Sequence, residues 1–252
     1  SLLFDVLGAS LRSDPRGGAG VECDAIELPE DHRGFAEVRG ERRRGGSAGT
    51  VLGALGLLAP MQRLFHESAQ AAGLDLPKPA FSFQSPKGRC ETCKGTGFES
   101  VSMDFLADLA LPCPGCAGRR YRAEVLEAKW HDLDVAGFLD TTASELRELL
   151  DAPRRSAKTP PHFVKLRAGL DALAEVGLGH LSLGRRRREL SGGELQRLHL
   201  ATSLNDAPSP CLHLFDEPAR GLHDTDITRL VAAFRRLAAR GDLVVVAEHR
   251  LG

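Results

Sequence analysis

Four cysteines in two CxxC pairs constrain this chain more than any other feature. Cys90 and Cys93 form the first pair, Cys113 and Cys116 form the second, and 19 residues separate the pairs. Each pair can present two thiolates to one ion, which gives a tetrahedral four-sulfur site closed to solvent. The pattern therefore predicts structural zinc, with iron in a rubredoxin-like site as the alternative. Thioredoxin-like redox use needs one CxxC at a helix start, and two matched pairs argue against it.

Charge and hydropathy are those of a soluble globular protein. The chain has 252 residues with 33 Lys and Arg against 34 Asp and Glu, and its net charge of -1 excludes a uniformly basic nucleic-acid coat but allows local basic patches. No run approaches the roughly 20 apolar residues that cross a bilayer, and the start lacks a signal-peptide pattern. We therefore expect a cytoplasmic protein with no membrane partner. In a reducing cytoplasm the CxxC pairs indicate a metal rather than disulfides, and Cys23 and Cys211, without partners at ligand spacing, are expected in the core.

The last third of the chain has the pattern of a parallel α/β core. An apolar strand that ends in two acids, an amphipathic helix and a second apolar strand follow one another, and this order indicates parallel pairing. The expected elements there are a strand at 211–216, a helix at 226–239 and a buried strand at 243–247. Upstream, the periodicity predicts helices at 57–70, 142–151 and 163–173, and strand-like pieces at 21–28, 34–38 and 124–135.

A serine and two glycines precede the helix that opens this core. Ser191, Gly192 and Gly193 let the backbone approach a phosphate, and the N–H groups of a helix start favour an anion. The alternative is a plain helix cap, in which Ser191 caps the helix and Glu194 completes a capping box. The residues alone leave both interpretations open.

Two carboxylates lie at the end of the following strand. Asp216 comes 25 residues after Ser191 and Glu217 follows it, at the carboxyl edge where α/β folds place their ligands. In phosphoryl transfer, Asp216 would hold Mg²⁺ through water and Glu217 would orient or deprotonate the attacking water. The next strand ends at His249, which is placed to contact a γ-phosphate. The alternative for Asp216 and Glu217 is a strand that simply ends in a turn. The alternative for His249 is an imidazole that is solvated or satisfied in the core.

The order and spacing of these motifs resemble the ABC-type ATPases, whose signature loop, Walker B strand, D-loop and switch His follow one another. With Gly221-Leu222-His223 at the D-loop and the cysteine pairs ahead of the signature, the chain resembles the carboxyl-terminal ATPase half of the UvrA family, the damage-recognition subunits of the bacterial excinuclease. The stretches GRCETCKGTGF, MDFLADLALPCPGCAGRRY and VGLGHLSLG also resemble that family. The resemblance implies ATP, Mg²⁺ and Zn²⁺ as cofactors. Its implied partners are lesion-containing double-stranded DNA, a second copy in a homodimer and the helicase-like next subunit of the excinuclease.

The resemblance also divides the chain into four expected parts of an α/β, ABC-type core with an inserted four-cysteine zinc module. They are a partial ATP-binding core at 1–80, the zinc insert at 81–140, a helical signature subdomain at 141–189, and the signature, Walker B, D-loop and switch His at 190–252.

Basic residues surround the cysteine pairs and precede the signature. Because this module lies close to DNA in the family, five of them are candidates for phosphate contacts, and a solvated rim around the zinc site is the alternative. These candidates are Lys87, Arg89, Lys94, Arg119 and Arg120. The run from Arg185 to Arg188 is expected to be either a solvated turn or a contact to a nucleotide or DNA phosphate.

The chain departs from the family pattern at three points. No GxxxxGK[ST] loop is present, so we expect a fragment that does not hydrolyse ATP alone. Glu37 takes the position of the Q-loop Gln at the nucleotide site, and Ala219-Arg220 takes the position of two Thr, which points to a divergent paralogue. A zinc-bearing DNA-binding relative with a decayed ATPase is therefore the rival hypothesis. A transporter ATPase is disfavoured, because it needs no such zinc insert.

Overall fold

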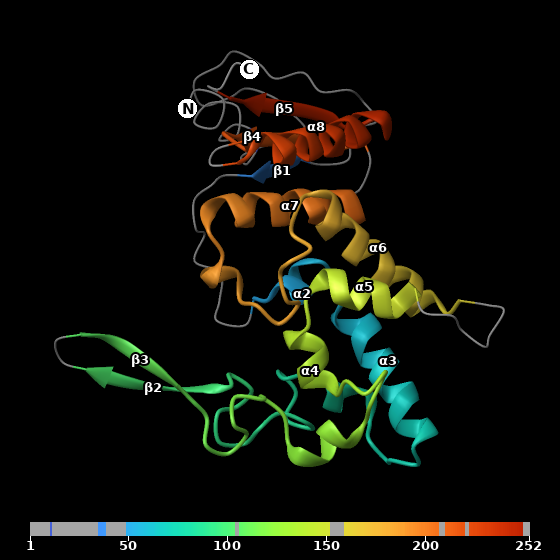
Figure 1. The fold of residues 1–252 in the computed structure, drawn as a ribbon, viewed down its shortest axis with the longest axis vertical. Helices are drawn as coiled ribbons and strands as arrows, with labels where there is room; N and C mark the ends of the chain where they lie inside the picture. The colour runs from blue at the N-terminus through green and yellow to red at the C-terminus, as the bar shows by residue number, and fades with distance from the viewer. Residues whose placement is uncertain are drawn as a thin grey trace. The chain divides into compact units, whose positions relative to one another are not determined.

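The computed structural model divides the chain into two compact units (Figure 1). The sheet unit comprises residues 1–45, 171–179 and 187–252, and the cysteine unit comprises residues 46–170 and 180–186. The residues described are 11, 35–38, 49–103, 106–151, 159–206, 210–219 and 222–248.

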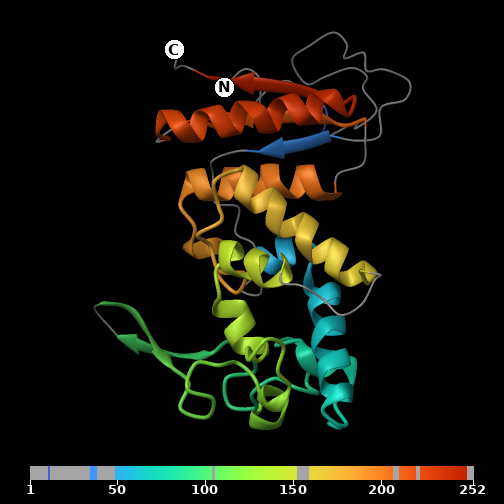
Figure 2. The ribbon, with the colours of Figure 1, turned by 45° about the vertical axis from the view of Figure 1, so that its right-hand side comes forward.

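The sheet unit contains the parallel core that the sequence predicts. Its strands are β1 (Phe35–Val38), β4 (Leu212–Asp216) and β5 (Leu243–Ala247), in the order β1-β4-β5 with both pairings parallel. Helix α8 (Asp224–Ala239) connects β4 to β5 and runs alongside the strands (Figure 2), and α7 (Gly192–Asp206) precedes β4. A parallel pair needs such a crossover, and here the apolar face of the helix covers the sheet. The rings of Phe215 and Phe234 meet at this contact, with centroids 4.8 Å apart.

One property of β5 differs from the expectation. The sequence predicts a buried strand, but Leu243 is 54% exposed and Val246 is 39% exposed. The physical reason is position, because among the described strands β5 pairs only with β4 and lies at an edge of the three-stranded sheet. Apolar runs of this kind are typical of central parallel strands, so composition alone misjudges the exposure.

Short helices around an aromatic core make up most of the cysteine unit. Phe65 packs against Phe81 and Phe138, with ring centroids 5.9 and 5.6 Å apart. The helices are α2 (Val51–Ala54), α3 (Leu58–Ala71), α4 (Val135–Asp140), α5 (Ala143–Asp151) and the part of α6 (Pro161–Glu175) up to Leu170, with 3-10 turns η2 (Lys78–Phe81) and η3 (Ala123–Glu127). The predicted helices at 57–70, 142–151 and 163–173 are thus confirmed by α3, α5 and α6.

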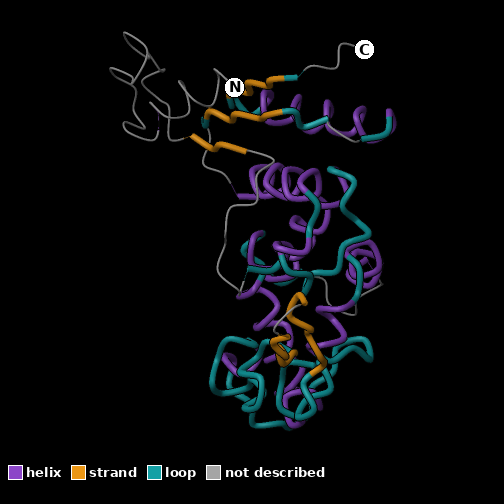
Figure 3. Tube along the Cα trace, turned by 90° about the vertical axis from the view of Figure 1, so that its left-hand side faces the viewer, coloured by secondary structure: helices purple, strands orange, loops and turns teal. Residues whose placement is uncertain are grey.

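A hairpin that the sequence analysis missed separates the two cysteine pairs. Strands β2 (Phe98–Met103) and β3 (Leu106–Pro112) pair in antiparallel register, with a shift between Val101 and Met103. Its strands are orange among the loops of this part of the unit (Figure 3). The hairpin brings the ends of the two CxxC segments together, because Phe98 pairs with Pro112 next to Cys113.

The prediction of a strand-like piece at 124–135 is wrong. The structure forms η3 there, then a tight turn in which Trp130 and Leu133 exchange backbone hydrogen bonds of 2.8 and 3.0 Å. His131 and Asp132, inside the turn, have φ values of 46° and 64°, which no strand allows. Asp134 then caps α4, so polar and turn-forming residues override the apolar alternation.

The finer division into four parts stays a prediction, since the structure separates the two units above. The predicted strand at 21–28 lies outside the described residues. Of the described helices, none combines the length and the apolar character that a membrane crossing requires.

Candidate functional site

The four predicted ligands converge in the cysteine unit. The Sγ atoms of Cys90, Cys93, Cys113 and Cys116 all lie within 4.8 Å of one another. Across the two pairs, Cys90 and Cys113 are 4.0 Å apart and Cys93 and Cys116 are 3.7 Å apart. Tetrahedral thiolates around an ion at about 2.3 Å have edges of this length.

Each CxxC pair is followed by a backbone turn of the same form. The N–H of Gly97 donates to the sulfur of Cys93, and the N–H of Arg120 donates to the sulfur of Cys116, both at 3.3 Å and both from the fourth residue after the cysteine. Gly97 and Arg120 also share a positive φ, 80° and 70°. The two turns are therefore a matched pair of knuckles that each direct one N–H group at a ligand sulfur.

Positive φ values recur in the residues between. Lys94 and Gly95 have φ of 52° and 86°, and Ala117 and Gly118 have φ of 48° and 82°. At Gly95 no side chain fits, because an added Cβ would lie 1.8 Å from the carbonyl oxygen of Phe83. The glycine pattern of the sequence is thus a requirement of the knuckle backbone.

The thiols of Cys90 and Cys116 differ in how readily they ionise. Burial opposes ionisation of Cys90, but N–H groups of Cys93 and Thr92 overcome it and lower the pKa of this thiol to about 7. Burial raises the pKa of the Cys116 thiol to about 12. Sulfurs this close ionise together only around a cation, and a soft, closed set of four thiolates suits zinc or iron.

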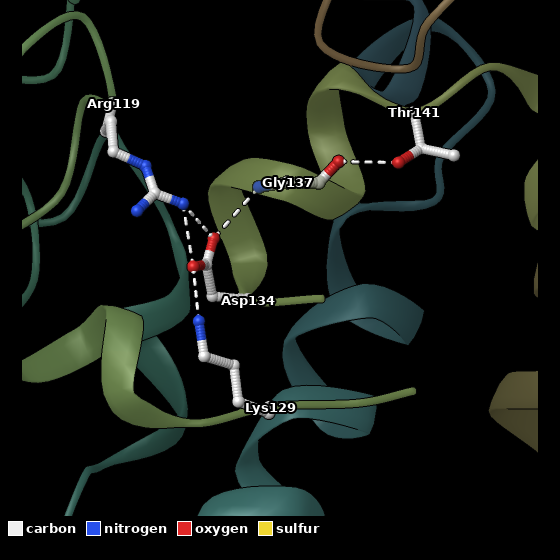
Figure 4. Close-up of polar contacts among 5 residues, drawn as sticks. All are labelled: Arg119, Lys129, Asp134, Gly137 and Thr141. Carbon is white, nitrogen blue, oxygen red and sulfur yellow. Dashed lines mark hydrogen bonds and ion pairs between the residues drawn. The ribbon is translucent and has the colours of Figure 1, made fainter. Parts of the chain in front are cut away.

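Arg119 contacts a buried carboxylate beside the second knuckle. It donates to both oxygens of Asp134 at 2.6 and 2.7 Å, and Lys129 donates to Oδ2 at 2.6 Å (Figure 4). Asp134 is 4% exposed and accepts the N–H of Gly137 at 2.9 Å, which caps α4. Burial raises the pKa of Asp134, but the N–H of Gly137, Lys129 and Arg119 outweigh it and hold the pKa below its usual value. This network ties the second knuckle to α4.

The other predicted DNA contacts differ in their surroundings. Lys87 and Lys94 are exposed, and Arg89 donates to the carbonyl of Gln84 at 3.4 Å. Arg120 donates two hydrogen bonds of 3.2 Å to the carbonyl of Gly184, and its guanidinium lies 5.6 Å from the ring centroid of Phe83. Arg119 and Arg120 therefore hold protein groups in this structure, while the two lysines face solvent.

The signature serine forms the capping box that the sequence left as an alternative. The N–H of Ser191 donates to Glu194 at 2.8 Å, and the N–H of Glu194 donates to the hydroxyl of Ser191 at 3.2 Å. The hydroxyl of Ser191 accepts in this bond and keeps its own proton as a donor. Because Ser191 is exposed and Gly192 and Gly193 are half-buried, capping leaves this helix start accessible to an anion.

Asp216 and Glu217 lie at the carboxyl end of β4, both half-buried. Asp216 pairs in register with Ala247 of β5, and the N–H of Glu217 donates to the carbonyl of Ala247 at 2.8 Å. Glu217 has a φ of 45°, an unfavourable conformation for a residue with a side chain and one that often marks functional positions. The hydrogen bond to β5 therefore helps to hold the turn after β4 in this unfavourable conformation.

A buried glutamine connects the signature helix to this edge. Gln196 is 5% exposed, and its side-chain amide donates to the carbonyl of Asp216 at 2.5 Å. Sequence reasoning did not assign it a role, although its place two residues after Glu194 was a usable signal. The bond fixes the first turns of α7 against the end of β4.

Comparison with known proteins decides the family. No model of a known protein family matches the chain. Over 197 residues, 78% of this chain, it is 36% identical to UvrABC system protein A of Staphylococcus aureus (strain COL) and 38% identical to that of Haemophilus ducreyi. The crystal structure of UvrA2 from Deinococcus radiodurans superposes on 87% of this chain with a TM-score of 0.75 and 33% identity. The matched residues belong to the UvrA family.

The match covers a limited part of each UvrA relative. The chain spans 20% of the length of the two curated proteins and 26% of the UvrA2 chain. It therefore corresponds to one part of the length of its UvrA relatives, and its fold is the α/β fold with a clustered four-cysteine module that the sequence predicts.

Two of the UvrA-like positions, His249 and Gly221, lie outside the described residues. Cys23, which the sequence predicts in the core, also lies outside them. Glu37 is described by its backbone, which lies in β1 in register with Leu214 of β4. Leu222 is buried and His223 is exposed at the N-cap of α8. Cys211 is 4% exposed, which confirms it as a core residue.

Proposed function

We propose that this chain is the carboxyl-terminal ATPase region of a UvrA-type damage-recognition subunit in bacterial nucleotide excision repair, acting in the cytoplasm. The observation that carries the proposal is the combination on one chain of a four-cysteine centre and a parallel-sheet edge that ends in Asp216 and Glu217. Membership of the UvrA family supports it.

Several residues share the chemistry of the proposed nucleotide site. Mg²⁺, when bound, neutralises phosphate charge. Asp216 would hold it through water, and Glu217 would orient or deprotonate the attacking water. His249 would contact the γ-phosphate, and Glu37 would lie near the metal as a further carboxylate. In the proposed homodimeric arrangement, Ser191, Gly192 and Gly193 face a phosphate bound by another nucleotide-binding half.

The placement of the carboxylates favours these roles. Gln196 and the carbonyl of Ala247 hold the main chain of Asp216 and Glu217 from two sides. A fixed backbone lets the half-buried carboxylates keep their geometry without a cost of reorganisation during the reaction. The half-burial of both residues also limits access of bulk water.

The cysteine unit supplies the proposed DNA contact. Zn²⁺ on Cys90, Cys93, Cys113 and Cys116 would hold the knuckles, and the exposed Lys87 and Lys94 are the favoured contacts to phosphates of lesion-containing duplex DNA. Arg89, Arg119 and Arg120 would contribute when they release their protein partners. The helicase-like next subunit of the excinuclease is the proposed protein partner.

ATP turnover by the complete polypeptide that contains this chain tests the proposal. We expect hydrolysis that depends on lesion-containing DNA and falls by about 100-fold or more in Glu217→Gln, because the catalytic carboxylate is lost. Glu127→Gln, an exposed Glu of the cysteine unit, is the matched control and keeps full turnover. Binding of DNA without any turnover in the unaltered protein would instead favour the rival, a zinc-bearing relative with a decayed ATPase, to which the Glu37 substitution points.

A further inference from the structure

Arg186 is buried in a run of four arginines that the sequence assigned to solvent or phosphate. It is 8% exposed, whereas Arg188 in the same run is exposed. Burial of a guanidinium is costly unless its N–H groups are paired and its face is packed. Contacts within the protein must therefore compensate the burial of Arg186.

The side chain of Arg186 reaches the first knuckle of the cysteine centre. It donates a hydrogen bond to the carbonyl of Thr96, and its guanidinium lies 4.7 Å from the ring centroid of Phe98. Stacking on an aromatic ring and donation to a carbonyl are both preferred uses of a planar guanidinium. Neither contact involves solvent or a phosphate.

The bond to Thr96 acts on a group that touches a ligand sulfur. The carbonyl of Thr96 and the N–H of Gly97 belong to one peptide unit, and that N–H donates to the Sγ of Cys93 at 3.3 Å. A cation on the carbonyl side polarises the peptide and strengthens the N–H on its other side. Because the peptide is planar, fixing its oxygen also fixes the direction of the N–H.

Arg120 makes the corresponding connection from the second knuckle. Its N–H donates to the Sγ of Cys116, and its guanidinium donates to the carbonyl of Gly184. Both knuckles are thus linked through one arginine each to the segment 184–186, which we call the lead segment. It lies five residues before Ser191 in the sequence.

The lead segment is also held from its other sides. The N–H of Val51 donates to the carbonyl of Arg185 at 3.0 Å, and the N–H of Gly184 donates to the carbonyl of Leu139 at 2.7 Å. An added Cβ at Gly184 would lie 2.8 Å from that carbonyl oxygen, so the packing there is close. A segment fixed by α2, α4 and two arginines moves only if the knuckles move with it.

We propose that Arg186 is a positioning residue for the metal centre: by holding the carbonyl of Thr96 it fixes the N–H of Gly97 on the sulfur of Cys93. The proposal rests on the geometry of the Thr96–Gly97 peptide and on the packing of the guanidinium against Phe98.

The test measures apparent metal affinity in the complete polypeptide by competition with a chelator, for zinc and for cobalt as a spectroscopic probe. We expect Arg186→Met, which keeps the buried stem but loses the donors, to weaken affinity about tenfold and to shift the cobalt–thiolate absorption. The matched control Arg188→Met leaves both unchanged. Arg186→Lys keeps a donor without the planar fork and is expected to be intermediate, and thermal unfolding verifies that each variant is folded.

Unchanged metal affinity in a folded Arg186→Met variant would overturn the positioning role. A uniform loss of DNA affinity in its place would make Arg186 a phosphate contact.

Discussion

The proposed metal centre and the proposed nucleotide edge of this chain are built in different ways. At the metal centre, four ligands and the N–H groups that donate to two of them come from residues 90–120. At the nucleotide edge, α7, β4 and β5 each supply a part, and Gln196 and Ala247 hold the end of β4. A site made of local turns depends on the conformation of single residues, whereas a site made of strand ends depends on the sheet. Substitutions should therefore have larger and more local effects at the metal centre.

The largest effect is expected at a ligand of the metal centre. Binding of structural zinc to four cysteines releases free energy on the order of 10 kcal/mol, so Cys93→Ser should unfold the knuckles and expose the surrounding amides to hydrogen exchange. The control Cys211→Ala removes a core cysteine from the sheet unit and should keep the metal. Protection of the knuckle amides in Cys93→Ser would mean that the turns fold without metal. It would contradict the contrast between the metal centre and the nucleotide edge.

A glycine substitution separates backbone conformation from close packing. Gly95→Ala places a Cβ 1.8 Å from the carbonyl oxygen of Phe83, and we expect it to lower the free energy of unfolding by more than about 2 kcal/mol. Gly73→Ala is the control, because Gly73 has a φ of 73° and no atom within 4 Å of an added Cβ. It should cost only about 1 kcal/mol. Equal losses in denaturant unfolding would show that the knuckle backbone is not tightly specified.

The buried carboxylate beside the second knuckle should have a smaller effect. Asp134→Ala removes the cap of α4 and the partner of Arg119 and Lys129, and we expect a loss of about 2 kcal/mol. Asp134→Asn keeps an acceptor for the N–H of Gly137 and should recover part of it. Chemical denaturation of the unaltered protein and the two variants measures these losses. A loss under about 0.5 kcal/mol in Asp134→Ala would show that the network contributes no more than an exposed ion pair.

The smallest effect concerns a histidine of the sheet. Burial lowers the pKa of His213, although Asp242, 3.5 Å from its Nε2, opposes the shift. The folded state therefore binds this proton more weakly than the unfolded state, so stability is fully present above the unfolded pKa of about 6.5 and is lost as pH falls below it. We expect His213→Gln to reduce the loss of stability between pH 6.5 and 5.5 by at most about 1 kcal/mol, the limit for one proton over that range. The measurement is the free energy of unfolding of both proteins as a function of pH. The same pH dependence in the unaltered protein and in His213→Gln would contradict the prediction.

The sequence predicted the parts of both sites that follow from spacing or periodicity. Cysteine spacing indicated the four ligands, and the order of strand, helix and strand indicated the parallel pairing. Ser191 and Glu194 offered the capping box as one of two interpretations. Contacts between distant residues were not predictable in this way. Arg186 reaches Thr96 across 90 positions, and no local pattern marks such a pair.

Backbone conformation was the other limit of the sequence. The turn at Trp130 and Leu133 has the apolar alternation of a strand, yet two residues with positive φ form it. The strained φ of Glu217 likewise follows from its hydrogen bond to β5 and not from its own residue type. Local hydrogen bonds hold the first conformation, and pairing with a distant strand holds the second.

X-ray absorption spectroscopy at the zinc edge tests the central claim most directly, which is that four cysteines of this chain hold one metal ion. The spectrum of the complete polypeptide should be compared with that of a variant in which Cys93 and Cys116 are replaced by Ser, so that the difference isolates this centre. We expect the difference to show four sulfur neighbours at about 2.3 Å from one zinc ion per chain. An unchanged zinc content, or oxygen and nitrogen neighbours in place of sulfur, would contradict the account.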